Sequence, residues 1–166
     1  MNSRWRTAAL CLVMLSCISC DQAAKAMARG GLVGRTISFL GDAVRLEYAE
    51  NTGAFLSLGA SLPSRTRTLL FVGGTSVIVL GLLVALARHR QGSMTGAVGL
   101  ALLAGGAVGN LIDRVAYGGA VVDFVSLGLG PFRTGIFNLA DVAITLGVVL
   151  VALQSRSGAT TSISGG

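Results

Sequence analysis

Two aspartates in apolar surroundings are the residues best placed to do chemistry. Asp141 lies within the apolar run 136–153, and a carboxylate inside a bilayer usually has either a partner or a function. Asp123 lies between Val122 and Phe124, where burial would raise its pKa because desolvation disfavours the charged form. Structural interpretations stay open at this point: Asp141 as part of a polar clasp between helices, and Asp123 as a solvated loop acid.

The composition indicates that a membrane positions these residues. Of the 166 residues, 52% are hydrophobic and only 12% are charged, and the mean hydropathy is +0.75. Soluble domains carry about 25% charged residues. Apolar runs at 68–87, 94–112 and 136–153 reach the roughly 17–25 residues that a transmembrane helix needs, and a shorter run covers residues 7–20. Too little chain remains for a second conventional domain, which excludes large soluble enzymes.

The basic residues and the cysteines exclude other classes. The net charge is +6, but the arginines mostly flank the apolar runs and no basic stripe interleaved with aromatic residues occurs, so we expect no nucleic-acid partner. Cys11, Cys17 and Cys20 lie in the first apolar run, where they behave as small apolar residues. No Cys/His spacing typical of a metal site is present, and we expect neither a metal nor a cofactor.

The first twenty residues have two interpretations. Their arginines, apolar run and Ser-Cys ending resemble a secretory signal peptide, of the kind that is cut before a lipidated cysteine, here Cys20. Alternatively, a retained helix runs from about Trp5 to Ala28, because the residues after Cys20 are good helix formers and Asp21 and Lys25 can pair at i, i+4. We favour the retained helix, since it completes an even bundle.

We predict an all-α membrane protein with four transmembrane helices, at about residues 5–28, 68–87, 94–113 and 136–154. They form a single integral membrane domain, residues 1–155, with both termini cytoplasmic. Alternating apolar residues around the Gly41-Asp42 turn predict a small extracytoplasmic β-hairpin, or cradle, within about 34–62. Residues 156–166 are expected to be a disordered tail.

An up-down-up-down order of these helices collects their polar residues at one membrane face. The end of the first span, the end of the third and the start of the fourth meet there, and they contribute Asp21, Lys25, Asn110, Asp113, Arg114, Asn138 and Asp141. Glycines of the third span, Gly105 among them, allow helices to approach closely. We also expect an ion pair between Asp113 and Arg114 at the end of the third helix.

Five motifs in order resemble those of one family. The sequence reads DQAAK at 21–25, NTGAF at 51–55, GGAVGNLIDR at 105–114, VDF at 122–124 and FNLAD at 137–141. Together they closely resemble the motifs of lipoprotein signal peptidase, the bacterial signal peptidase II, over about residues 5–153. Ala24 stands where a threonine is common, and the stretch after Asn51 lacks a second alanine before its phenylalanine, which affects only the expected fine contacts with substrate.

The resemblance implies an aspartyl peptidase of the bacterial inner membrane, acting near the outer face. It implies cleavage of the signal peptide from prolipoproteins just before a diacylglyceryl-modified cysteine, by a chain that is a monomer and contacts membrane lipid. The implied catalytic residues are Asp123 and Asp141. The implied substrate-binding or site-bracing residues are Asp21, Lys25, Asn51, Gly53, Ala54, Gly105, Asn110, Asp113, Arg114, Asn138 and Ala140.

Such a pair has a defined chemistry. Two close carboxylates repel, so one keeps a proton near neutral pH; the ionised one can then activate a water while the protonated one donates to the scissile carbonyl. Two alternatives remain at this point: a proton- or ion-coupled membrane carrier that uses Asp141, and a lipoprotein anchored at Cys20.

Overall fold

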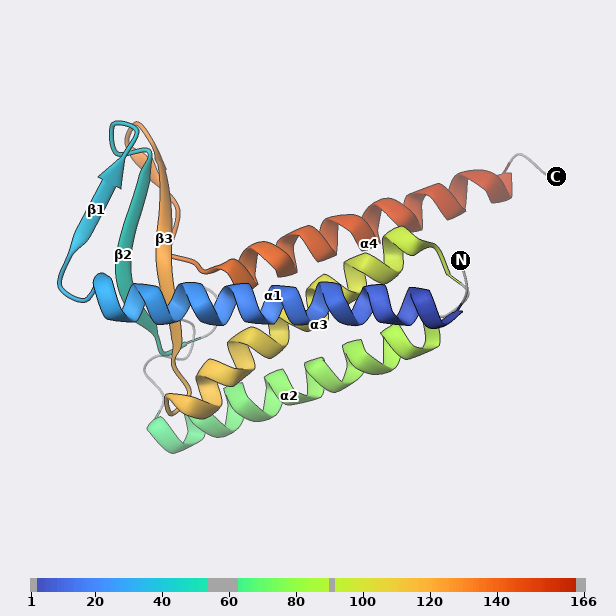
Figure 1. Ribbon diagram of the computed structural model, residues 1–166, viewed down its shortest axis with the longest axis horizontal. Helices are drawn as coiled ribbons and strands as arrows, with labels where there is room; N and C mark the ends of the chain where they lie inside the picture. The colour runs from blue at the N-terminus through green and yellow to red at the C-terminus, as the bar shows by residue number, and fades with distance from the viewer. Residues whose placement is uncertain (1–2, 54–62, 90–91, 164–166) are drawn as a thin grey trace.

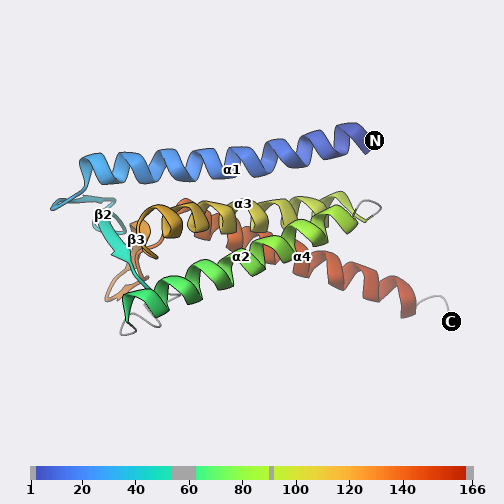
Figure 2. The same cartoon turned by 90° about the horizontal axis from the view of Figure 1, so that it is seen from below.

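Four long helices run side by side and carry a small sheet at one end (Figures 1 and 2). The structure is a computed structural model that describes residues 3–53, 63–89 and 92–163. The helices are α1 (Ser3–Gly31), α2 (Ser64–Arg88), α3 (Met94–Ala116) and α4 (Leu139–Ile163). The strands are β1 (Thr36–Phe39), β2 (Val44–Asn51), β3 (Val121–Leu129) and β4 (Phe132–Arg133). The protein is therefore mostly helical, as predicted, with the sheet beside one end of the bundle.

Within the described part of the chain, three helices are long and apolar enough to cross a membrane: α1, the Arg65–Arg88 part of α2, and α3. In α4 the apolar part, Leu139–Gln154, is shorter. The prediction of four spans is thus confirmed for three helices. The fourth helix begins at Leu139 rather than at 136, and it continues to Ile163, past the boundary expected at 155.

The first helix is continuous through Cys20, as the retained-helix interpretation predicts. The polar residues that follow Cys20 lie on the inward side of the same helix, where Asp21, Lys25 and Ala28 are buried. Residues before and after Cys20 therefore form one structural element.

Helix α3 lies at the centre of the bundle and packs against the three other helices. Small residues make its contact with α4 close: a Cβ on Gly106 would lie 2.5 Å from the Ala140 carbonyl oxygen, and one on Gly147 would lie 2.7 Å from that of Gly99. On the opposite side, a Cβ on Gly105 would lie 3.1 Å from Cys17 of α1. These contacts bear out the packing role expected for the glycines of α3.

The sheet combines two separate loops. Its strands are antiparallel in the order β1-β2-β3-β4. The predicted hairpin is present as β1 and β2, joined by a turn in which Leu40, Gly41 and Asp42 all have positive φ. The connection between α3 and α4, for which the sequence predicted no strand, supplies β3 and β4. Strand β3 pairs with β2 along most of its length, which places Asp123 opposite Ala49.

Candidate active site

Asp123 is a buried residue of β3, only 3% exposed. One carboxylate oxygen, Oδ1, accepts a hydrogen bond from Asn138 Nδ2 at 2.7 Å, and the other, Oδ2, accepts from Asn51 Nδ2 at 3.1 Å. Asn51 is itself oriented by Gly53, whose backbone N–H donates to its Oδ1 at 3.1 Å. The interpretation of Asp123 as a solvated loop acid is therefore wrong. Strand pairing holds this carboxyl group in one place, between two amides.

Asp141 lies in the first turn of α4, where it belongs to a reciprocal helix cap. Its backbone N–H donates to Asn138 Oδ1 at 3.0 Å, and its own Oδ2 accepts from the Asn138 backbone N–H at 3.2 Å. This is the arrangement of a capping box, which fixes both side chains relative to the helix. The second oxygen, Oδ1, accepts from Asn110 Nδ2 at 3.0 Å.

One amide therefore contacts both acidic residues. The Asn138 side chain, which is fully buried, donates to the carboxylate of Asp123 and accepts from the backbone of Asp141. Asn138 Nδ2 also lies 3.1 Å from Asn110 Oδ1, which links the two amides to each other. Asn138 and Asn110 thus fix the relative positions of Asp123 and Asp141, because each amide is itself held from two sides.

The surroundings of Asp123 tune its acidity. Burial, together with the negative charge of Asp141, raises its pKa to about 6 even though the Asn51 and Asn138 hydrogen bonds and Lys25 act to lower it. A carboxyl group with such a pKa exchanges its proton near neutral pH, which is what a general acid or base requires. Desolvation was the cause expected from its apolar sequence neighbours.

Behind these residues lies a buried ion network with Lys25 at its centre. Lys25 Nζ lies 2.8 Å from Asp21 Oδ2 and 3.2 Å from Asp113 Oδ2, and all three side chains are at most 1% exposed. The same amine donates to Asn110 Oδ1 at 2.9 Å. The predicted pair of Asp21 and Lys25 is confirmed. The predicted pair of Asp113 and Arg114 is wrong, since Asp113 pairs with Lys25 of α1 instead.

The network also holds the backbone next to each candidate catalytic residue. Asp21 Oδ1 accepts from the N–H of Ala140, the residue before Asp141, at 2.9 Å. Asp113 Oδ2 accepts from the N–H of Val122, the residue before Asp123, at 2.9 Å. One lysine therefore connects, through two carboxylates, the backbone segments that carry both aspartates.

Gln22 is a functional-site neighbour that was not expected from the sequence. Its Nε2 donates to Asp113 Oδ1 at 3.0 Å and to the Gly109 carbonyl oxygen at 3.1 Å, which ties α1 to α3 beside the ion network. Its place three residues before Lys25, on the same helix face, is the signal that could have identified it.

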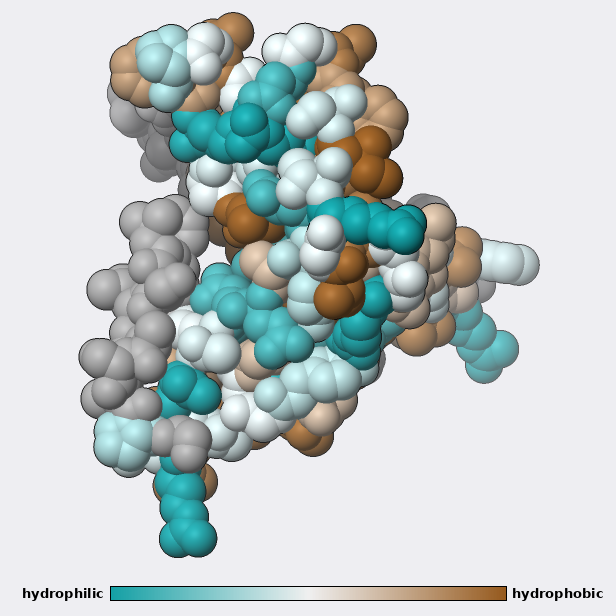
Figure 3. All heavy atoms as spheres, turned by 90° about the vertical axis from the view of Figure 1, so that its left-hand side faces the viewer, coloured by the Kyte–Doolittle hydropathy of each residue, from teal (hydrophilic) through white to brown (hydrophobic). Residues whose placement is uncertain are grey.

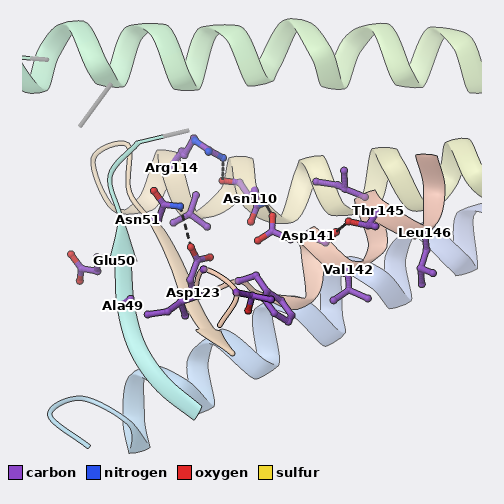
Figure 4. A pocket seen from close by; sticks show the side chains of 16 residues that line it. Ala49, Glu50, Asn51, Asn110, Arg114, Asp123, Asp141, Val142, Thr145 and Leu146 are labelled. Atoms are coloured by element: carbon purple, nitrogen blue, oxygen red, sulfur yellow. Dashed lines mark hydrogen bonds between the residues drawn. The ribbon is translucent and has the colours of Figure 1, made fainter. Parts of the chain in front are cut away.

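A cavity of about 1130 Å³ opens in front of the two aspartates (Figure 4). Polar groups at one end include Asn51, Asn110, Arg114, Asp123 and Asp141. The rest of the wall is largely apolar and includes Ile136, Phe137, Val142, Ile144 and Leu146. A ligand with one polar segment and a longer apolar segment would match this lining.

The other residues that were expected at the site lie in different parts of the structure. Arg114 lines the cavity and donates from Nη1 to the Asn110 carbonyl oxygen at 3.3 Å, while its buried Nε has no hydrogen-bond partner among the described residues. Gly105 packs on α1, on the side of α3 opposite to Ala140. Ala54 lies outside the described residues. Within the described ranges, no group of three or more His, Cys, Asp or Glu side chains could hold a metal ion.

Comparison with known proteins identifies the family. Residues 13–156 match the family described as Signal peptidase (SPase) II. A lipoprotein signal peptidase of Sphingopyxis alaskensis is 43% identical over 112 residues, which cover 66% of this chain and 62% of that relative. One of Desulforapulum autotrophicum is 37% identical over 151 residues, 90% of this chain and 92% of the relative. A solved structure described as a bacterial membrane enzyme has a TM-score of 0.75 at 24% identity, over 93% of this chain and 91% of that one, which supports the fold. The chain belongs to the signal peptidase II family.

Proposed function

We propose that the protein cleaves the signal peptide from diacylglyceryl-modified prolipoproteins, immediately before the lipidated cysteine, with Asp123 and Asp141 as an aspartyl pair. Membership in the signal peptidase II family supports the peptidase activity and the class of substrate. The observation that supports the aspartyl mechanism is the single amide of Asn138 bound to both acidic residues at the wall of the cavity.

In this mechanism the two carboxyl groups share one proton. The ionised group takes a proton from a water, and the resulting hydroxide attacks the scissile carbonyl while the protonated group donates to its oxygen. The tetrahedral intermediate then collapses, and the leaving amine receives a proton from the pair. Asn51, Asn110 and Asn138 keep the carboxyl oxygens oriented, so little reorganisation is needed during the reaction.

The apolar wall of the cavity suits the lipid of the substrate. Acyl chains would lie along α4, beside Val142, Ile144 and Leu146, while the peptide bond next to the modified cysteine lies at the polar end. Binding the lipid in this way places the scissile bond before the aspartates, which lowers the entropic cost of the reaction.

The topology that fits this function has four transmembrane helices, with α4 as the fourth, in one domain of about residues 1–155. Both termini would lie on the cytoplasmic side of the bacterial inner membrane, and the sheet and the aspartates near its outer face. We take the active unit to be a monomer, as the resemblance of the sequence motifs implies.

The alternatives are not favoured. Family membership supports a peptidase rather than a proton- or ion-coupled carrier. A lipoprotein anchored at Cys20 would lose the part of α1 that precedes this cysteine, although α1 is continuous there and its buried residues continue from Leu10 to Ala28. The intact mass of the membrane-extracted protein checks this point, since retention of residues 1–20 without lipid excludes lipoprotein anchoring.

A cleavage assay with purified protein in detergent micelles tests the proposal. Wild-type protein is expected to cut a lipidated precursor peptide and to leave the same peptide without lipid uncut. Asp123→Asn and Asp141→Asn are each expected to abolish cleavage while the protein stays folded. Asp42→Asn is the matched control, because Asp42 is a half-exposed acid in the turn between β1 and β2 and does not line the cavity. Cleavage retained in either site variant would refute the aspartyl mechanism, and no cleavage by wild type would refute the function.

A further inference from the structure

The sheet has one polar face and one apolar face. Residues paired across antiparallel strands lie on the same face, so the register assigns each side chain. One face carries polar rows, namely Thr36 with Glu47, Ser38 with Arg45 and Ser126, and Arg133 beside them. The other face carries apolar rows, namely Ile37 with Leu46 and Val125, Phe39 with Val44 and Leu127, and Leu129 with Phe132.

Among the described residues, only the inner part of the apolar face is covered by other parts of the protein. Leu46 and Val125 pack against a buried cluster that includes Ala28 and Leu32, at the end of α1. Beyond them the same face continues to the two tight turns of the sheet, where large apolar side chains are exposed: Phe39 at 47%, Leu40 at 82%, Leu127 at 44%, Leu129 at 84% and Phe132 at 78%. We call these five residues the apolar tip.

The position of the apolar tip relative to the helices indicates what covers it. In Figure 1 the end of the sheet with both turns projects to one side of the bundle (top left), and along the direction of the helix axes it lies near the ends where α2 begins and α3 ends (bottom left). Helices that cross a bilayer end at its interface, so this projection lies beside the lipid surface rather than over protein. Seen from that end, hydrophilic residues lie in the middle of the projection, with hydrophobic residues above and to the right of them (Figure 3).

The polar side chains and the backbone conformation at the apolar tip agree with a lipid partner. Arg45 and Arg133 both pair with Asp42 in the turn beside the apolar residues, while Glu47 lies further along the same polar face. Arginines beside exposed apolar side chains suit a phospholipid surface, because the guanidinium groups reach phosphates while the apolar groups enter the acyl boundary. Leu40 has a φ of 53°, which is rare for a leucine, and this conformation presents its side chain at the outermost turn.

We propose that the apolar tip is a membrane-contact surface, which inserts into the headgroup region of the leaflet at this end of the helices. Contact with lipid removes Phe39, Leu40, Leu127, Leu129 and Phe132 from water. It also holds β2 and β3, and with them Asn51 and Asp123, at a fixed height above the bilayer. This inference depends on the fold and not on the enzymatic activity.

Tryptophan fluorescence tests the proposal, because Trp5 is the single tryptophan of the chain. In a Trp5→Phe background, Phe39→Trp places a reporter on the apolar face, and Ser38→Trp places a matched reporter one residue away on the polar face. Leu129→Trp reports on the second turn. Each protein is reconstituted into phosphatidylglycerol–phosphatidylcholine nanodiscs with and without brominated acyl chains, and its helical circular-dichroism signal verifies folding.

Insertion predicts blue-shifted emission for Phe39→Trp and Leu129→Trp, with a strong loss of fluorescence when the lipid is brominated. Ser38→Trp is expected to emit at longer wavelength and to lose much less. Equal quenching of Phe39→Trp and Ser38→Trp would overturn the proposal. Blue-shifted emission of Phe39→Trp without quenching would also overturn it, because the apolar tip would then be covered by protein, such as a second copy of the chain.

Discussion

Lys25 offers the most informative perturbation, because one amine neutralises two buried carboxylates. Lys25→Met keeps a side chain of similar length but removes both ion pairs, at 2.8 Å and 3.2 Å, and leaves Asp21 and Asp113 buried without a cation. Removing one partner of a buried pair costs about 3–5 kcal/mol, since the remaining charge is uncompensated. The expected loss corresponds to a fall of about 100-fold or more in the ratio of folded to unfolded protein.

The assay compares unfolding free energies in mixed micelles with cleavage by the folded fraction. Arg45→Met is the matched control, because Arg45 also pairs with an aspartate but at a half-exposed position, where solvent screens the ion pair and it contributes little. For Lys25→Met we expect lower stability and, in the protein that remains folded, a lower kcat with little change in KM. The reason is that Asp21 and Asp113 orient the backbone immediately before both candidate catalytic residues.

A double variant separates charge from packing. Lys25→Met combined with Asp113→Asn removes one uncompensated carboxylate, yet the amide oxygen can still accept from the Val122 N–H. We expect it to be more stable than Lys25→Met alone, which gives a favourable coupling in a double-mutant cycle. If Lys25→Met were as stable and as active as Arg45→Met, the reasoning from buried charge would be refuted.

Further predictions concern proton binding and helix packing. Because burial, with the charge of Asp141, raises the Asp123 pKa from 3.8 to about 6, the folded state binds more protons than the unfolded state between about pH 4 and pH 6, and stability falls as pH rises through this window. Asp123→Asn should therefore gain about 2–3 kcal/mol relative to wild type from pH 4 to pH 7 in unfolding titrations, and a constant difference would contradict this. Asn51→Leu removes a hydrogen bond that lowers this pKa, so the limb of the pH–rate profile that Asp123 sets should move to higher pH; a profile with both limbs unchanged would contradict this effect of Asn51. Gly106→Ala should lower both stability and activity, because its Cβ would meet the Ala140 carbonyl oxygen at 2.5 Å, whereas Gly73→Ala, with nothing within 4 Å, should be tolerated; equal effects on melting temperature would contradict the packing argument.

Sequence patterns over a few neighbouring residues predict the helices, the hairpin and the ion pair within α1, because interactions between residues close in the chain determine them. Apolar runs of sufficient length predict helices in the right order, and alternation around Gly41-Asp42 predicts the hairpin of β1 and β2. The pair of Asp21 and Lys25 follows from helix geometry alone, since residues four apart lie on one face. The same geometry argues against a pair of Asp113 and Arg114, because adjacent helical residues point in different directions.

Strand β3 was not predictable in the same way. Its first four residues, 121–124, are all buried, so the strand begins without the alternation that marks a half-buried strand. Its partner β2 lies in the other loop, and only this long-range pairing brings Asn51 to Asp123. The apolar, β-branched start of β3 was compatible with a strand, but nothing local identifies the partner.

The start of α4 was misplaced because apolar residues were counted as helix. Phe137 belongs to the run 136–153, but its backbone forms a bridge with Val125 of β3. The polar residues indicate the start of the helix better, because Asn138 and Asp141, three residues apart, have the spacing of a capping box. Asp141 therefore lies at a helix entrance beside the sheet, rather than one turn deeper in a span.

The hydrogen bond between Ala140 and Asp21 joins residues that are 119 positions apart in the chain. During synthesis α1 emerges first and α4 last, so Asp21 and Lys25 are made long before the residues of α4 that they hold in place. The paired aspartates are likewise completed only by the final helix. Under the proposed aspartyl mechanism, a nascent chain without α4 would lack Asp141 and could not hydrolyse peptide bonds, so the order of synthesis itself would keep the protease inactive until the last helix has been inserted.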